Sequence, residues 1–185
     1  MSQDLPVTSY ALLGLLTFGD DLTGYELKQR ADRTLRYYWV APAMSQVYSE
    51  LDRLAENGLV RARDAGPNRR STKYRITPSG RRALTRWMTD EPAGFPVLKH
   101  PVALRLLIGH LVDPDVTRRM LREHLDALAE HRAGLAGVRE SLRGRDEPGE
   151  AFRYPSLVAD WGLEYLDGER TILEKLLARL EEEDS

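Results

Sequence analysis

The sequence predicts a mainly α-helical fold that contains one small β-hairpin. Apolar residues recur at helical spacing through most of the chain, and two short alternating segments flank a loop rich in Gly, Pro and Arg. A third observation divides the chain, because residues 90–100 hold two prolines and a glycine, which do not fit inside a regular helix. We therefore expect a first domain at residues 1–90, a linker at 91–100 and a second domain at 101–185.

The first two helices are predicted from an apolar run and a capping signal. Residues 8–18 are apolar enough for a buried helix, which residues 19–21 (Gly-Asp-Asp) interrupt. Thr23–Glu26 reads as a capping box, in which a Thr hydroxyl and a Glu carboxylate each accept from an unpaired backbone N–H group. The second helix then has a single apolar stripe, formed by Leu27, Ala31 and Leu35.

A third helix is expected to start near Pro42 and to stop at Gly58, since Pro suits a first turn and Gly the position after the last one. Its apolar face consists of Met44, Val47, Leu51 and Leu54. Small polar residues occupy the N-terminal half of the other face, and charged residues follow them: Ser45, Gln46 and Ser49, with Tyr48 on the flank, then Asp52, Arg53 and Glu56. This order suits a helix whose N-terminal end enters a DNA major groove.

The hairpin follows directly. Val60 and Ala62 alternate with arginines, and Tyr74 and Ile76 alternate with Lys73 and Arg75, which predicts two short half-buried strands with basic outer faces. The loop between them spans residues 65–72 and carries Arg69 and Arg70 at its tip. Thr77-Pro78 then caps and starts a fourth helix, at residues 79–89, with Leu84, Trp87 and Met88 on its apolar side. A helix followed by a basic hairpin is the order of a winged helix-turn-helix.

Charge is distributed unevenly, although the net charge of the 185 residues is only -2. Residues 1–85 hold 13 Lys and Arg against 9 Asp and Glu, whereas the remainder holds 14 against 20. A local basic patch on an otherwise acidic chain is typical of a specific DNA-binding protein. A merely solvated basic surface is the alternative interpretation.

The second domain is predicted to be helical throughout. A short apolar helix at residues 101–112 precedes a long one from Asp113-Pro114 to about Leu142, and a polar loop at 144–155 leads to a last helix at 156–182. The long helix has a heptad-like apolar series that Arg132 interrupts: Leu121, Leu125, Leu128, Leu135 and Leu142. Two such helices are expected to pack in a homodimer, with a hairpin packed within one chain as the alternative.

Three segments resemble the PadR family of bacterial transcriptional regulators: L-L-G-L-L-T-F-G-D-D-L-T-G-Y-E-L-K, then Y-Y-W-V-A-P-A-M-S-Q-V-Y-S-E-L-D-R-L-A-E-N-G-L-V, then K-Y-R-I-T-P-S-G-R-R-A-L. The Y-Y-W-V-A and V-Y-S-E-L segments, together with the long second half of the chain, resemble the branch of this family that has a virulence-activator-like C-terminal domain. The resemblance implies a winged-helix DNA reader, a C-terminal dimerisation domain, and repression or less often activation of a nearby promoter. Release of DNA by a small, often aromatic, molecule is also implied.

The resemblance carries over to particular positions. Tyr25 and Tyr48 match tyrosines near the family's DNA face, and residues 45, 46 and 49 lie on its recognition helix. Arg69, Arg70 and Lys73 match the wing. One departure is Ser49, where many members have Pro after the helix tyrosine; it favours the virulence-activator-like branch and leaves the operator sequence open.

Each predicted DNA contact has an alternative. Arg69, Arg70 and Lys73 are expected to neutralise phosphates, although a hairpin tip can simply be solvated. Gln46 could pair with adenine, and Ser45 or Ser49 with a base edge or a phosphate. Arg53 completes the predicted DNA-binding set, and Tyr48 could be purely structural.

Aromatic residues of the helices are the candidates for an effector site. Trp161 and Tyr165 lie one turn apart on the last helix and could line an aromatic pocket, or could belong to a core. Trp87 and Trp39 could likewise belong either to an effector pocket or to a core.

Other chemistries find no support in the sequence. The chain has no Cys, no catalytic or phosphate-binding motif and no cofactor signature, and its four histidines, at 100, 110, 124 and 131, lack the close spacing of a metal site. We therefore expect neither an enzyme nor a bound cofactor. The start of the chain does not read as a signal peptide and no apolar run is long enough for a membrane, so a cytoplasmic location is expected. A winged-helix protein-interaction module without DNA binding, favoured by Asp52 and Glu56, is the alternative function.

Overall fold

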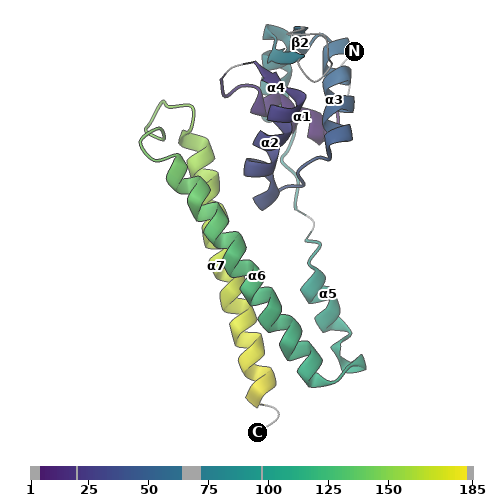
Figure 1. Cartoon of the computed structure of the whole chain (residues 1–185), viewed down its shortest axis with the longest axis vertical. Coiled ribbons are helices and arrows are strands. Elements are labelled where there is room, and N and C mark those ends of the chain that lie inside the picture. Colours follow the sequence, from purple (N-terminus) through teal and green to yellow (C-terminus); the bar gives the residue numbers. More distant parts are fainter. Residues whose placement is uncertain (1–4, 20, 64–71, 97, 183–185) are drawn as a thin grey trace. The chain divides into compact units, whose positions relative to one another are not determined.

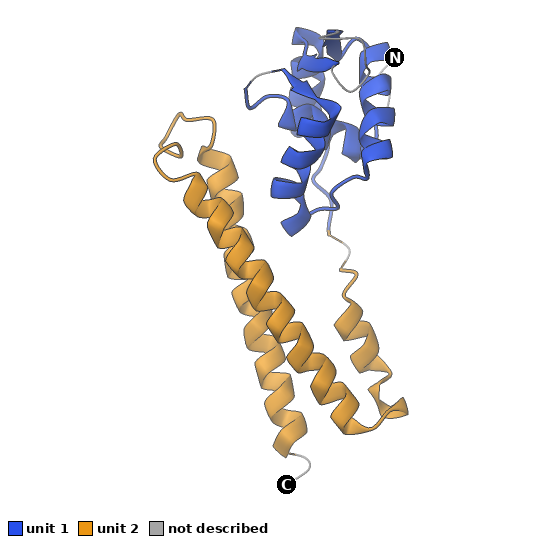
Figure 2. Ribbon diagram, viewed as in Figure 1, with its two compact units in different colours: residues 1–95 blue, residues 96–185 orange. Residues whose placement is uncertain are grey.

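The structure, a computed structural model, describes residues 5–19, 21–63, 72–96 and 98–182 and divides into two compact units. The first unit is Met1–Phe95 and the second is Pro96–Ser185 (Figure 2). Helices dominate both units, and the first also contains a small three-stranded sheet (Figure 1). The predicted fold class, mainly α with a small hairpin, is therefore confirmed.

The first unit contains four α-helices, a 3-10 turn and three strands among the described residues: α1 (Val7–Leu15), β1 (Leu22–Thr23), α2 (Gly24–Thr34), η1 (Leu35–Tyr37), α3 (Met44–Glu56), β2 (Val60–Arg63), β3 (Lys73–Ile76) and α4 (Pro78–Asp90). The sheet is antiparallel with the order β1-β3-β2. β1 was not predicted, because a two-residue strand has no alternation to detect. It pairs Thr23 with Lys73 and thereby joins the start of α2 to the hairpin.

The core of this unit forms where α1, α2 and α3 meet. Leu12 and Leu13 of α1, Leu27 of α2, and Val47, Leu51 and Leu54 of α3 are all completely buried. The predicted apolar stripes of α2 and α3 are thus confirmed, except that Met44 is only half-buried. Burying leucines at helical spacing from three helices removes most of their apolar surface from water, which is the main stabilising contribution to such a fold.

The helix ends follow the predicted capping chemistry. The Thr23 hydroxyl accepts from the backbone N–H of Glu26 at 3.2 Å, and a Glu26 carboxylate oxygen accepts from the backbone N–H of Thr23 at 2.8 Å. At the end of α3 Gly58 adopts a positive φ of 66°. Leu59 N–H then donates to the Leu54 carbonyl and Gly58 N–H to the Ala55 carbonyl, each at 2.9 Å. This is a Schellman closure, and it fixes the direction in which the chain enters β2.

Several predicted boundaries and faces were wrong. α1 ends at Leu15 rather than Phe18, and α3 begins at Met44 because Ala43 before it is extended. Ala62 is exposed although it points to the core side of β2, and Met88 on α4 is 71% exposed. A four-residue strand and the far end of a helix reach past the small core, so periodicity alone overestimates their burial.

Gly80 in α4 allows a close approach between this helix and the chain entering β2. A Cβ at Gly80 would lie 2.2 Å from the Leu59 carbonyl oxygen, a backbone atom that cannot rotate away. We expect Gly80→Ala to lower the free energy of unfolding by about 3 kcal/mol through overpacking. Gly14→Ala in α1 is the matched control, because nothing lies within 4 Å of its Cβ position. It should be neutral or stabilising by up to about 1 kcal/mol. Equal urea midpoints for the two variants would contradict the close approach.

The second unit is formed by α5 (Pro101–Leu107), η3 (Gly109–Leu111), α6 (Pro114–Ser141) and α7 (Arg153–Glu182). The two long helices α6 and α7 lie side by side (Figure 1). Leu121, Leu128 and Leu135 of α6 are buried together with Leu166 and Leu173 of α7. α7 begins at Arg153, so Pro155 lies in its first turn and not, as predicted, in the preceding loop. Proline is accepted there because the first N–H groups of a helix have no partner within it.

Arginines of α6 bind acidic residues of α7 across this helix pair. Arg132, which interrupts the heptad-like series, donates two hydrogen bonds to Asp167, at 2.7 and 2.8 Å. Arg139 donates to Asp160 at 2.7 Å. The hydrogen bonds from Arg132 lower the pKa of the Asp167 carboxyl below its ordinary value. The interruption of the apolar series therefore has a partner, and the helix pair forms within one chain.

No helix among the described residues is long and apolar enough to cross a membrane.

Candidate nucleic-acid interface

The first candidate surface is the polar face of α3, formed by Ser45, Gln46, Ser49 and Arg53. All four are exposed, whereas Val47, Leu51 and Leu54 anchor the opposite side of the helix in the core. The Ser49 hydroxyl donates to the Ser45 carbonyl at 3.0 Å, and this bond fixes the direction of the Ser49 hydroxyl on the helix surface. The structure thus brings the predicted polar side chains onto one accessible, firmly anchored helix face.

Arg53 forms an ion pair with Glu50, a buried acidic residue that was not predicted from the sequence. Its Nη1 atom lies 3.7 Å from Oε1 of Glu50, and Glu50 accepts a hydrogen bond from the buried Ser9 hydroxyl of α1. Glu50 is only 6% exposed. Its position in the sequence could have indicated this burial, because residue 50 falls between Val47 and Leu54 on the apolar face of the helix. A buried carboxylate with a donor on α1 fixes the rotation of α3 and hence the direction of its polar face.

The two predicted tyrosines lie at the junction of α2 and α3. A Cβ on Gly24 would come within 2.5 Å of the Tyr48 ring, so this ring packs directly on the first residue of α2. Tyr48 is half-buried, and Tyr25, the next residue along α2, is 55% exposed with its hydroxyl accepting from Gln29 at 3.1 Å. The Tyr48 ring therefore has a packing role, which leaves the contact of either hydroxyl with DNA as a prediction.

The second candidate surface is a group of four cations on the β2–β3 pair. The register places Arg61 opposite Arg75 and Arg63 opposite Lys73, so all four side chains leave the same face of the sheet. Arg75 also forms an ion pair with Asp21. We call Arg61, Arg63, Lys73 and Arg75 the cation ladder. Only Lys73 belonged to the predicted site. Basic outer faces were predicted for both strands, but which cations face one another required the register, which the sequence does not give. Arg69 and Arg70 lie outside the described residues.

Contacts connect the ladder to α3. Lys73 pairs with Thr23, the residue that caps α2, and the following residue, Gly24, contacts Tyr48 of α3. The hydrogen bonds from Thr23 lower the pKa of the Glu26 carboxyl, and the positive charge of Lys73 acts in the same direction. The start of β3, the first turn of α2 and the middle of α3 are therefore adjacent in the fold.

The predicted effector residues fall into two groups. Trp87 stacks on Tyr10 in the first unit, with ring centroids 4.8 Å apart. Trp161 and Tyr165 stack on each other along α7, with centroids 5.7 Å apart, and are 57% and 47% exposed. Within the chain they are surface residues, so the alternative that they belong to its core was wrong. Tyr165 also lines a cavity of about 400 Å³ between α5 and α7.

Two protein-family models match the sequence of this chain. Residues 12–86 match the model of the transcriptional regulator PadR-like family, and residues 98–181 match the virulence activator alpha C-terminal model. The chain belongs to the PadR-like family. Its members are transcriptional regulators and not enzymes, and the predicted resemblance, including the virulence-activator-like branch, is confirmed.

Relatives and solved structures of this PadR-like chain agree with the assignment. The probable transcriptional regulator Rv1176c from Mycobacterium tuberculosis is 39% identical over 70 residues, which cover 37% of this chain and 36% of that protein. The structure of Bacillus subtilis PadR in complex with operator DNA has a TM-score of 0.80 at 24% identity, covering 95% of this chain and 99% of that one. The Vibrio cholerae virulence activator AphA has a TM-score of 0.70 at 22% identity, covering 94% and 97%. These similarities show that the chain shares the fold of these proteins.

Proposed function

We propose that the chain is a homodimeric regulator that reads a pseudo-palindromic operator by placing the N-terminal half of α3 in the major groove. The exposed Ser45, Gln46 and Ser49 on that half support this role. Gln46 is suited to adenine, and the two serines to a base edge or a phosphate. Tyr25, Tyr48 and Arg53 flank them and would contact the sugar-phosphate backbone.

The observation that carries the proposal is the cation ladder. Like charges directly opposite one another destabilise an antiparallel pair. Asp21 forms an ion pair with one of the four cations, Arg75. The charge of Lys73 also acts on the Glu26 carboxylate. Two facing cation pairs on one exposed strand face nevertheless form a basic surface that suits an anionic partner outside the chain. A DNA backbone supplies regularly spaced phosphates, and Arg69 and Arg70, which follow β2 in the sequence, are proposed to add to the same contact.

A second apolar stripe on α7 supports the homodimer. Tyr154, Val158, Trp161, Tyr165 and Ile172 follow heptad spacing and are between 37% and 76% exposed. The seam that α7 shares with α6 uses other residues, among them Gly162 and Leu166. We call these five residues the α7 stripe and infer that a second copy of the chain covers it. Two-fold symmetry would then place operator half-sites about 10 bp, or a multiple of that, apart.

We further propose repression that a small aromatic molecule relieves. Bacillus subtilis PadR has been solved with p-coumaric acid, which supports a ligand of this class. Trp161 and Tyr165 of the second unit, or separately Trp87 of the first, are the candidate contacts, since stacked and partly exposed rings suit a flat aromatic ligand. The alternative function, a protein-interaction module, draws on the exposed Asp52 and Glu56 of α3.

Replacing Arg69 and Arg70 by alanine distinguishes the two functions. Under DNA binding we expect affinity for genomic fragments that the protein captures to fall, and the salt slope of log K to become shallower by about two per protomer. The measurement is fluorescence anisotropy at several salt concentrations. Arg170→Ala with Arg179→Ala, two exposed arginines of α7, is the matched control and should leave both quantities unchanged. An unchanged affinity for the Arg69/Arg70 variant would favour the interaction module.

A further inference from the structure

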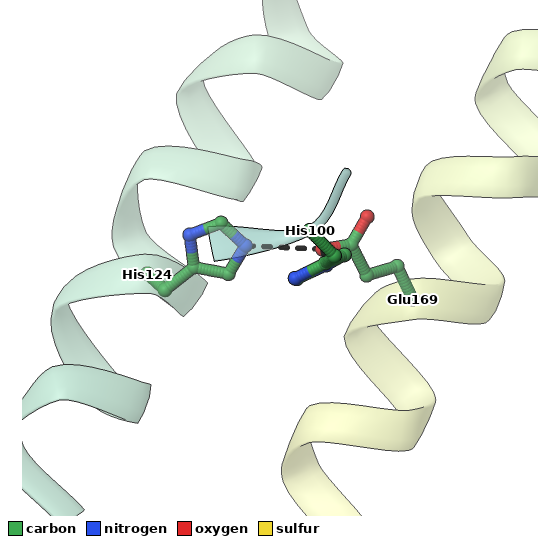
Figure 3. A group of neighbouring side chains, drawn as sticks. All are labelled: His100, His124 and Glu169. Atoms are coloured by element: carbon green, nitrogen blue, oxygen red, sulfur yellow. Dashed lines mark hydrogen bonds and ion pairs between the residues drawn. The ribbon is translucent and has the colours of Figure 1, made fainter. Parts of the chain in front are cut away.

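Three ligating side chains from three elements meet inside the second unit. His100 precedes α5, His124 lies on α6 and Glu169 on α7 (Figure 3). Nε2 of His100 lies 2.7 Å, and Nε2 of His124 3.0 Å, from the same Glu169 oxygen, Oε1. The side chains are 18%, 30% and 16% exposed, so water competes only partly for them. Residues 24 and 45 positions apart in the sequence could not have been grouped by spacing.

The hydrogen bonds define the state of this cluster without an ion. Nδ1 of His100 accepts from the Ala103 backbone N–H at 3.2 Å and caps α5, so the ring proton lies on Nε2 and is donated to Glu169. Burial raises the pKa of the Glu169 carboxyl, but the hydrogen bonds from His124 and His100 outweigh it and leave this pKa below its ordinary value. Oε1 of Glu169 therefore lies between two imidazole nitrogens, so three potential ligand atoms face one another.

We propose that His100, His124 and Glu169 form a binding site for one divalent transition metal of the zinc type. Two imidazoles and one carboxylate are the protein ligands of an open zinc site, in which water or a further ligand takes the fourth position. All three candidate atoms lie within 4.8 Å of one another. Tetrahedral zinc places N and O ligands about 3.3 Å apart. The two short contacts would lengthen by about half an ångström, and the separation of the two imidazole nitrogens, which is at most 4.8 Å, would approach the same value.

Metal binding would change the start of α5. Ligation through Nε2 moves the ring proton of His100 to Nδ1, which then repels the Ala103 N–H, so the cap of α5 is lost. The fourth position would be accessible from the cavity between α5 and α7, which His100 and Glu169 line. None of the site's residues belongs to the first unit, which carries the proposed DNA contacts.

Titration of the chelator-treated, full-length protein with Zn²⁺ tests the proposal. Isothermal titration calorimetry should give one ion per chain, and Co²⁺ should give the visible absorption of a four-coordinate site. Glu169→Gln and His124→Gln should each weaken zinc binding at least about 100-fold. His110→Gln is the matched control, since His110 is exposed on η3 and outside the cluster, and it should bind as the unmodified protein does.

A fourth variant, His124→Cys, gives a spectroscopic signal that an unfolded protein would not produce. The chain has no Cys, so in His124→Cys a thiolate-to-cobalt charge-transfer band can come only from position 124. We expect that band with one Co²⁺ per chain. The proposal is overturned if the unmodified protein binds no zinc at millimolar concentration, if both glutamine variants bind as tightly as the control, or if the cysteine variant shows no charge-transfer band.

Discussion

Replacing both Ser45 and Ser49 by glutamate is expected to weaken operator binding at least about 100-fold, because two carboxylates would then face the phosphates and base edges that we propose the serines contact. Both positions are exposed and lie on the side of α3 that the core does not use. Glutamate is also a good helix former, and a negative charge in the first turn interacts favourably with the helix dipole. The free energy of unfolding should therefore change by less than about 0.5 kcal/mol.

The matched control for this variant is Ser141→Glu. Ser141 is exposed near the end of α6, and its hydroxyl also donates to a backbone carbonyl of its own helix, that of Val138 at 2.7 Å. It should bind operator DNA as the unmodified chain does. Anisotropy titrations and urea unfolding of all three proteins measure the two effects separately. If the double variant kept full affinity, α3 would not be the element that enters the groove.

Ile172→Asp is expected to convert the proposed dimer to monomers. Ile172 is 60% exposed within the chain and lies on the α7 stripe, where a second copy would cover it. Two-fold symmetry would bury the new carboxylate twice without a partner, at a cost of about 3 kcal/mol or more in association. That corresponds to a dimer dissociation constant at least about 100-fold larger, and binding of the two operator halves should weaken with it.

Ala178→Asp provides the comparison for that variant. Ala178 is also exposed on α7, but its position lies on a different side of the helix from Ile172. Analytical ultracentrifugation over a range of concentrations should give a dimer for Ala178→Asp and for the unmodified chain, and a monomer for Ile172→Asp. A stable dimer of Ile172→Asp would place the interface away from the α7 stripe.

Local chemistry made most of the first unit predictable. The capping box at Thr23, the Gly58 stop and the apolar stripes of α2 and α3 each depend on residues within a turn or two of one another. Such short-range signals do not need the tertiary fold. The resemblance to the PadR family predicted the fold of the second half of the chain as well, and the two family models confirm that resemblance.

Features that depend on distant residues were not predictable. The facing pairs of the cation ladder require the register of β2 against β3, and the residues of β1 pair with residues 50 and 52 positions away. The Glu50–Ser9 bond joins two helices, and the His100, His124 and Glu169 cluster joins three elements. The exposure of Trp161 could not be predicted either, because a helix with two apolar stripes does not reveal which one packs within its own chain.

Binding of the purified protein to the DNA upstream of its own gene, compared with random DNA across a salt series, tests the central claim most directly. A dimer whose protomers each neutralise three phosphates should give a slope of log K against log salt of about −5 or steeper. It should also prefer its own site over random DNA by about 1,000-fold or more. A flat salt response, or equal affinity for the two DNAs, would contradict the account.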